Sequence, residues 1–342
     1  MVNPPLFAGI DDGYFATKAV INGRPCSLKS RVRSGTATKI ALLDGSDRGV
    51  SEFVTGGQHY TVGSSESDNL RSAEYPTSAF NRVLVQAALV KGGAAGRDVH
   101  LTTGLPVDQF FVAASTKRNE RLIEAKTQNM MTGVGLADGS DPARVVKHSV
   151  MAEGMAAWYA YILKESVDGN GEPNGCHRIK SRLGESIALI DIGGKTTEIV
   201  VIEDRAIVRT ASCSIDCGIH DVYDLLATRL ESEFGMGALT LEKLDEVYKS
   251  GIMKLDGKNR NVIHHVDGAR NEVAARLREH IQNRLGSKGR SLDVVRFIGG
   301  GTSELKKQLS ELYAHQSFAE DPVFENARGN YLVGRYIEAG SN

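Results

Sequence analysis

The chain reads Ile10-Asp11-Asp12-Gly13, then Thr17-Lys18-Ala19-Val20-Ile21. The pattern returns 180 positions later as Ile190-Asp191-Ile192-Gly193, then Thr197-Glu198-Ile199-Val200-Val201. Each copy consists of an apolar run, an Asp-x-Gly turn and a second apolar run, which is a strong local signal for a β-hairpin. Recurrence of such a unit indicates internal duplication. The sequence therefore predicts an α/β protein with two related lobes, each of which presents one hairpin to a shared cleft.

Length and composition agree with two globular lobes. The 342 residues exceed the roughly 150 residues of a typical single domain. The chain has 41% hydrophobic and 24% charged residues, and 41 basic against 42 acidic residues give a net charge of −1. This balance argues against direct binding of nucleic acid. We see no leader pattern and no apolar run of the ~18 residues that a membrane span needs, so we expect a cytoplasmic protein with no membrane partner.

Cysteine and histidine usage gives no sign of a metal site. The four cysteines are too few and too unevenly spaced for a disulfide framework or a zinc ligand set. We expect reduced, structural thiols. The nine histidines form no set at ligand spacing, and we expect His264-His265 in a loop or on the surface.

Outside the hairpins, helical patterns alternate with turn-rich segments. Apolar residues recur every three or four positions over 80–88 and 150–163, which predicts helices. A mostly helical insert covers about 218–290, and its buried stripe is predicted to consist of Val273, Leu277, Ile281 and Leu285. Segments 134–147 and 165–185 are polar and rich in glycine, so we expect surface loops, the second of which separates the lobes.

Three glycine turns carry the chemical prediction. An Asp at a strand end, followed by a glycine turn, sets a carboxylate beside free backbone amides, which suits a hydrated magnesium ion next to phosphate oxygens. The strand 294–298 leads into Gly299-Gly300-Gly301 and a helix from about residue 302, an arrangement that brings backbone close to a ligand. Gly194-Lys195-Thr196 is similar to the end of a P-loop, but Leu189 stands where that motif requires glycine and a strand follows. A P-loop is therefore excluded.

Together these motifs resemble the nucleotide core of the actin, heat-shock-70 and sugar-kinase superfamily. Residues 10–18 are similar to its first phosphate motif, residues 189–198 to its second, and residues 297–304 to its adenosine motif, in the same order. The resemblance implies a duplicated actin-like (ribonuclease H-like) fold with two lobes around a nucleotide cleft.

Softer similarities point to one branch, the bacterial plasmid-segregation actins of the ParM/StbA family. They are Asp11-Asp12 and the runs 102–106, 149–154 and 330–334. On this basis lobe I covers 1–165, with the C-terminal segment 322–342 packing back on it. Lobe II covers 185–321 and contains the helical insert.

The resemblance also implies roles for individual residues. Glu153 would orient or activate the water that attacks the γ-phosphate, while Asp11 and Asp191 would hold Mg2+ through waters. The residues implied to contact the nucleotide are Asp12, Gly13, Tyr14, Lys18, Gly193, Gly194, Lys195, Thr196, Gly299, Gly300, Gly301 and Thr302. Tyr14 replaces a small hydroxyl residue of the family, so only its backbone amide is carried over. Lys195 also replaces a small residue, and an exposed turn lysine is favoured over a phosphate ligand.

The implied function is an ATPase (ATP, or GTP) that polymerises head to tail with nucleotide and disassembles after hydrolysis. It would drive plasmid segregation with a centromere-binding adaptor of the ParR type, without touching DNA itself. The alternative is a small-molecule kinase for a sugar or carboxylate from the same superfamily, although we see no sugar-binding signature. A non-catalytic nucleotide-binding scaffold stays open, while a chaperone-type ATPase is disfavoured because few residues follow the adenosine motif.

Overall fold

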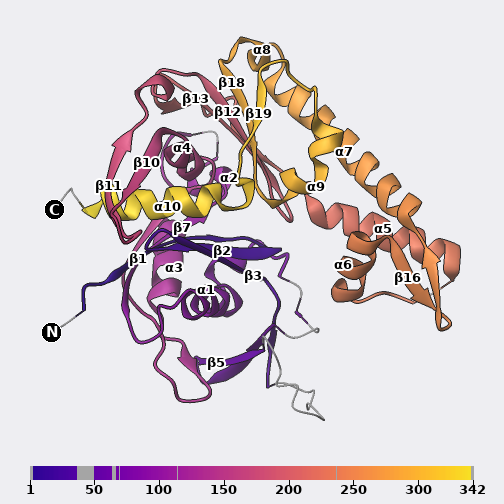
Figure 1. The fold of residues 1–342 in the computed structure, drawn as a ribbon, viewed down its shortest axis with the longest axis horizontal. Helices are drawn as coiled ribbons and strands as arrows, with labels where there is room; N and C mark the ends of the chain where they lie inside the picture. Colours follow the sequence, from indigo (N-terminus) through magenta and orange to yellow (C-terminus); the bar gives the residue numbers. More distant parts are fainter. Residues whose placement is uncertain are drawn as a thin grey trace.

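The computed structural model describes residues 3–36, 50–63, 67–68, 70–113, 115–235 and 237–339. Two mixed β-sheets form the cores of two lobes, and a pair of helices lies between them (Figure 1). The duplication predicted from the hairpins is confirmed in the order of the strands.

The sheet of the first lobe has the order β3-β2-β1-β7-β9. Its first three strands are antiparallel neighbours, whereas β1, β7 and β9 run parallel. Helices α1 and α3 pack on the sheet face that points away from the second lobe (Figure 1). A small sheet, β4-β6-β5-β8, closes the far side of α1. The elements are β1 (Leu6–Asp12), β2 (Ala16–Ile21), β3 (Arg24–Lys29), β4 (Val32–Ser34), β5 (Ser51–Thr55), β6 (Gln58–Val62), α1 (Ala79–Lys91), β7 (Asp98–Leu105), α2 (Val107–Phe110), α3 (Glu120–Met131), β8 (Gly135–Leu136) and β9 (Arg144–Ala152).

The sheet of the second lobe has the order β14-β13-β12-β18-β19, with β15 also paired to β13. Strands β13-β12-β18-β19 repeat the arrangement of β2-β1-β7-β9, including one antiparallel and two parallel pairings. The elements are β12 (Ile187–Ile192), β13 (Thr197–Glu203), β14 (Ala206–Ile207), β15 (Cys213–Ile215), β18 (Val294–Ile298), α9 (Gly300–Leu309) and β19 (Gln316–Phe318).

The insert of the second lobe builds one continuous core with this sheet. The predicted stripe of Val273, Leu277, Ile281 and Leu285 is fully buried in that core, as expected for one apolar face of a long helix. Figure 1 shows the insert extending sideways from the sheet, with α6 and the β16–β17 hairpin at its tip. Its elements are α5 (Ile219–Phe234), α6 (Leu241–Ser250), β16 (Ile252–Leu255), β17 (Lys258–Asn261), α7 (Ile263–Leu285) and α8 (Lys288–Ser291).

Helices α4 (Met155–Ile162) and α10 (Glu325–Tyr336) lie between the two sheets (Figure 1). They contact each other closely, and α10 also covers β1. Buried side chains of both lobes meet them in a single core, for example Val20 from the first sheet and Leu189 from the second. The two lobes are therefore joined by an apolar layer below the hairpins.

Three predictions of local structure need correction. The predicted helix 150–163 begins only at Met155, because the preceding residues pair with β7 as the end of strand β9. A short apolar run suits a buried strand and a helix equally well, and pairing with the neighbouring strand made this run a strand. Segment 165–185 contains most of a hairpin, β10 (Leu163–Val167) with β11 (Pro173–Arg178), followed by a short 3-10 helix over Lys180–Arg182. Segment 134–147 likewise contributes β8 and the start of β9.

All four cysteines are free, as predicted. Across the described residues, no helix combines the length and apolarity needed to cross a membrane.

Candidate functional site

The two repeated hairpins face each other at the junction of the lobes. The turn of β1–β2 and the turn of β12–β13 line one cavity together with residues from β7 and α3. Phe15 crosses from the first hairpin into the second lobe, where its ring lies 5.5 Å from that of His220 and 5.6 Å from that of Tyr223. The second turn is held from behind, because the backbone N–H groups of Ile219 and His220 donate to the carbonyls of Gly193 and Gly194 at 3.1 and 2.8 Å. Both turns are thus fixed in place around the cavity.

The first hairpin pairs its aspartate with a lysine. Asp11 and Lys18 are direct cross-strand neighbours, and the Lys18 Nζ donates to Asp11 Oδ2 at 2.9 Å. Both side chains are almost fully buried. Although burial lowers it, the attraction of Asp11 raises the pKa of Lys18 above its ordinary value. Lys18 is therefore a fixed positive charge in the cavity wall.

The second hairpin has a carboxylate at the position of that lysine. Asp191 and Glu198 are the corresponding cross-strand neighbours, and both are buried. Burial, and after it repulsion from Asp11, raises the pKa of Asp191 to about 7. Burial also raises the pKa of Glu198 to about 7, against a lowering hydrogen bond from the Ser214 hydroxyl at 2.5 Å. Glu198 Oε1 has no hydrogen-bond partner among the residues that the structure describes.

Helix α10 supplies a polar group that ties Asp191 to the first lobe. The Asn326 amide donates to Asp191 Oδ2 at 2.5 Å, and its Oδ1 accepts from the backbone N–H of Gly154 at 3.1 Å. Gly154 follows Glu153 directly, so one side chain connects the aspartate of lobe II to the glutamate turn of lobe I. Sequence reasoning missed Asn326.

Glu153 lies at the turn between β9 and α4. Its backbone N–H donates to the Leu105 carbonyl at 2.8 Å, and its side chain lies against Gly104. Gly154 has φ +74°, and a Cβ there would stand 2.4 Å from Cγ2 of Val200 in the other lobe, so only glycine fits. Burial, and after it the carboxylate of Glu198, raises the pKa of Glu153 well above its usual value. The turn that carries Glu153 is therefore in contact with both lobes.

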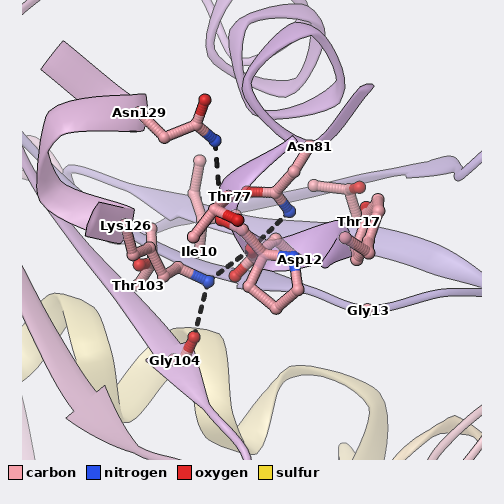
Figure 2. Close-up of polar contacts among 12 residues, drawn as sticks. Ile10, Asp12, Gly13, Thr17, Thr77, Asn81, Thr103, Gly104, Lys126 and Asn129 are labelled. Carbon is pink, nitrogen blue, oxygen red and sulfur yellow. Dashed lines mark hydrogen bonds and ion pairs between the residues drawn. The ribbon is translucent and has the colours of Figure 1, made fainter. Parts of the chain in front are cut away.

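A buried lysine holds the second aspartate of the first hairpin (Figure 2). Lys126 of α3 has 1% of its side chain exposed, and its Nζ donates to Asp12 Oδ2 and to the Gly104 carbonyl, each at 2.7 Å. Asn81 of α1 donates to the same Asp12 oxygen at 2.6 Å. The Asp12 carboxylate is thus engaged by the protein. Lys126 also gave no signal in the sequence.

The charge in the cavity wall suits a hard divalent cation. Five carboxylates and three lysines line it, which leaves an excess of two negative charges when all are ionised. Carboxylate oxygens are the ligands that Mg2+ prefers. One of them, Glu198 Oε1, accepts no hydrogen bond from the residues that the structure describes. Asp11 and Asp191 are the two carboxylates at the ends of the paired strands, where an ion between the hairpins would lie.

The glycine triplet closes the back of the site. Gly299 has φ +86°, and a Cβ there would stand 2.0 Å from Asp191 Oδ1, so a larger residue would displace that carboxylate. Gly300 and Gly301 border a second cavity of about 220 Å3, which shares Phe15, Lys18, Gly193 and Gly194 with the first. Tyr223, Asp245, Lys249 and Glu304 also line it. Thr302 is buried, and its hydroxyl donates to the Ile298 carbonyl. Its side chain therefore stabilises the first turn of α9.

Family models match the two lobes separately. Residues 9–164 match the model "Plasmid segregation protein ParM, N-terminal", and residues 189–311 match "Archaeal actin homologue MreB-like, C-terminal". The chain is therefore an actin-like protein whose first lobe is similar to the ParM/StbA family and whose second lobe is similar to an archaeal actin homologue. No curated protein sequence matches it.

Solved actin-like structures match over nearly the whole chain. A non-polymerisable quadruple mutant of pCBH ParM is 19% identical, covers 97% of this chain and 99% of its own, and has a TM-score of 0.75. The 15-stranded ParM filament from Clostridium botulinum gives 19% identity, the same coverage and a TM-score of 0.74. The archaeal actin homologue Ta0583 in complex with ADP gives 19% identity, 97% and 98% coverage and a TM-score of 0.72. These matches confirm the two-lobed actin-like fold.

The structure brings most of the predicted site residues of this actin-like chain together. One cavity is lined by Asp11, Asp12, Gly13, Tyr14, Lys18, Glu153, Asp191, Gly193, Gly194, Lys195 and Thr196. The Tyr14 ring packs against the Tyr75 ring, with 4.9 Å between the ring centroids. Lys195 donates to the Arg71 carbonyl at 3.2 Å and lies over the Tyr14 ring. Gly299 and Thr302 do not line either cavity directly.

Ion pairs cross between the lobes at the outer edge of the cleft, and we call them the mouth contacts. Arg71 of lobe I makes two hydrogen bonds to the Asp224 carboxylate of α5, at 2.6 and 3.1 Å. Lys29 and, at 4.0 Å, Arg31 contact Asp245 of α6. Opening of the cleft would break all of them.

Charged residues of α7 pair with the neighbouring helix. Glu272 binds Arg229 at 2.9 Å, and Arg276 lies 3.7 Å from Asp221, both on α5. Packing of α5 along α7 offered each a partner on the neighbouring helix. The prediction of a loop or surface position for His264-His265 is correct in part: the pair lies in the first turn of α7, His264 is exposed, and His265 is buried.

Proposed function

We propose that this chain is a nucleotide triphosphatase, acting on ATP (or GTP), that polymerises with nucleotide and disassembles after hydrolysis. The observation that carries the proposal is the meeting of Asp11 and Asp191, from two duplicated hairpins, in one cavity between the lobes. An anionic ligand bound there touches both lobes at once. If that ligand is a nucleotide, the presence or loss of its terminal phosphate therefore changes how favourable closure of the two lobes is.

Backbone and lysine groups would hold the phosphates. Gly13, Gly193 and Gly194 line the cavity, and Lys18 adds a fixed positive charge. Asp11 and Asp191 would hold Mg2+ through its waters. When bound, Mg2+ supplies positive charge that offsets the repulsion among the carboxylates and the phosphate oxygens. The second cavity, beside Gly300 and Gly301, is where we place the nucleoside.

Glu153 would activate the attacking water. In the free pocket the pKa of Glu153 is raised well above its usual value, because burial and neighbouring carboxylates disfavour the charge. With the charge of the pocket balanced, Glu153 ionises and can accept a proton from water at hydrogen-bond distance. The water oxygen then bonds to the γ-phosphorus as the bond to the leaving diphosphate oxygen breaks.

The contacts of Glu153 explain how hydrolysis would change the conformation. Its turn touches Val200 of lobe II, and Asn326 links the next residue to Asp191. Loss of the γ-phosphate would remove a group that Glu153 and the Mg2+ held by Asp191 would both contact. The mouth contacts at the outer edge of the cleft would then break more readily, and the cleft would open.

Assembly and partners are proposed by likeness to ParM. The ParM of Clostridium botulinum forms a 15-stranded filament, and we infer a head-to-tail filament of this chain as well. Such a filament would drive plasmid segregation in the cytoplasm through a ParR-type adaptor that binds the centromere, without direct contact of this chain with DNA. The net charge of −1 agrees with an indirect link to DNA.

Light scattering and phosphate release, followed together after adding ATP and Mg2+, test this proposal. We expect scattering to rise above a critical protein concentration, decay as phosphate appears, and persist in Glu153→Ala. Asp191→Ala should neither scatter nor hydrolyse. Flat scattering at tens of micromolar protein, with hydrolysis only when a sugar or carboxylate is present and becomes phosphorylated, would instead establish the kinase alternative.

A further inference from the structure

A histidine and glutamate cluster lies at the tip of the insert, far from the nucleotide cavity. Glu233 stands in the last turn of α5, and His264 and His265 stand in the first turn of α7. One potential ligand atom from each residue lies within 4.8 Å of the other two. In Figure 1 these helix ends meet toward the outer end of the insert. The three residues are thus gathered by tertiary structure, although Glu233 is distant in sequence from the histidines.

The residue types match a transition-metal site. Imidazole nitrogen with carboxylate oxygen is a donor set that zinc, cobalt and nickel ions prefer, at metal–ligand distances of about 2.0–2.2 Å. Ligand atoms within 4.8 Å of one another need only small side-chain rotations to reach that geometry. Magnesium, by contrast, favours oxygen donors alone. The cluster therefore differs in chemistry from the carboxylates of the nucleotide cavity.

A second observation points to a missing ligand. His265 is buried, with 8% of its surface exposed, and its Nε2 makes no hydrogen bond to any residue that the structure describes. This nitrogen is 2.7 Å from Glu233 Oε2, but the contact lacks hydrogen-bond geometry. Buried polar atoms are rarely left without a partner. A metal ion bound by both atoms would satisfy them.

Two further contacts join the helices that carry the cluster. Arg229 of α5 binds Glu272 of α7 at 2.9 Å, about two turns along from the histidines. The Phe234 ring contacts the His265 ring edge to face, with 6.3 Å between centroids. Glu233 and His264 are exposed, so a fourth coordination position would face solvent.

We propose that Glu233, His264 and His265 bind a divalent transition-metal ion of the zinc class. The ion would join the end of α5 to the start of α7, with water or a donor from another molecule as its fourth ligand. The inference rests on these three residues alone and is independent of the proposed nucleotide chemistry.

Titration of the nucleotide-free chain with Co2+ and Zn2+ tests the site. We expect one equivalent of Co2+ to produce visible ligand-field absorption that Zn2+ displaces. Zn2+ should also raise the melting temperature, because it binds only the folded chain. His264→Ala and Glu233→Gln change exposed side chains, so they should fold, and each should weaken Zn2+ binding by about tenfold or more.

Two control variants locate the binding. His280→Ala removes an exposed histidine of the same helix, and Asp191→Asn removes a carboxylate of the nucleotide cavity. Both should keep the parent Zn2+ affinity. The proposal is overturned if the parent shows no absorption with Co2+, if His264→Ala binds Zn2+ as tightly as the parent, or if Asp191→Asn is the variant that loses binding.

Discussion

Lys18 and Glu198 occupy equivalent positions in the two repeated hairpins. Lys18 pairs across the strands with Asp11, and Glu198 pairs in the same register with Asp191. The first hairpin is therefore neutralised internally, while the second carries two carboxylates. This asymmetry concentrates negative charge on the lobe II side of the cavity, where Asp191 and Glu198 both have a pKa of about 7.

The raised pKa of Glu198 predicts a pH-dependent stability. A carboxyl group whose pKa is higher in the folded chain contributes stability at low pH, and that contribution is lost as the pH rises through about 7. Glu198→Gln removes the cost of the buried charge. We expect it to raise the free energy of unfolding by ~1–3 kcal/mol at about pH 8 and to have little effect at about pH 4.

Urea denaturation of the nucleotide-free chain at both pH values measures this. Glu279→Gln, on the exposed face of α7, is the matched control and should change nothing. A Glu198→Gln chain that is less stable than the parent at about pH 8 would contradict the buried-charge account.

The contacts of Asn326 predict a loss of hydrolysis without a loss of fold. Asn326→Ala removes the donor to Asp191 and the acceptor for the Gly154 N–H. Because groups of this kind orient the residues that act on the ligand, we expect the rate of phosphate release to fall by about 10–100-fold. Asn271→Ala, on the exposed side of α7, serves as the control. Unchanged phosphate release in Asn326→Ala would show that the link is structural only.

The buried Lys126 and Asp12 pair predicts a strong coupling energy. Lys126→Met leaves the Asp12 carboxylate buried without its cation, which should lower the free energy of unfolding by ~3–5 kcal/mol. Asp12→Asn on top of Lys126→Met should recover part of this loss, because no charge is then buried. Lys117→Met, at an exposed lysine, should have an effect within about 0.5 kcal/mol. Additive effects in the double-mutant cycle would rule the coupling out.

The mouth contacts predict faster nucleotide exchange when their charges are reversed. Arg71→Glu places a carboxylate opposite Asp224, and this should open the cleft more often. Both side chains are exposed, so the pair is worth at most about 1 kcal/mol and the release rate should rise by roughly fivefold. Stopped-flow release of a fluorescent nucleotide measures it. Adding Asp224→Arg should restore slow release; failure to restore it would argue against the ion pair.

Local signals made the hairpins and the duplication predictable. Asp-Gly turns between apolar runs specify hairpins within about a dozen residues, so Asp11 and Asp191 could be identified without knowledge of the fold. The last residues of β9 could not be predicted as a strand, because their apolar run fits both a strand and a helix. Only their pairing with β7 decides between the two.

Long-range contacts hid the remaining site residues. Lys126 is 114 positions from Asp12, and Asn326 is 135 positions from Asp191, so neither stands in a motif with its partner. Glu198 was different, because it occupies the position of Lys18 in the quoted repeat. Comparison of the two copies position by position would have identified it.

Equilibrium binding of radiolabelled ATP to the parent and to Asp191→Asn, with and without Mg2+, tests the central claim most directly. If the two hairpins hold one Mg2+-nucleotide complex between the lobes, the parent should bind one ATP in a Mg2+-dependent manner. Asp191→Asn should lose that dependence and bind about 100-fold more weakly. Equal binding by both proteins, or binding by the parent that is indifferent to Mg2+, would contradict the assignment of the cavity.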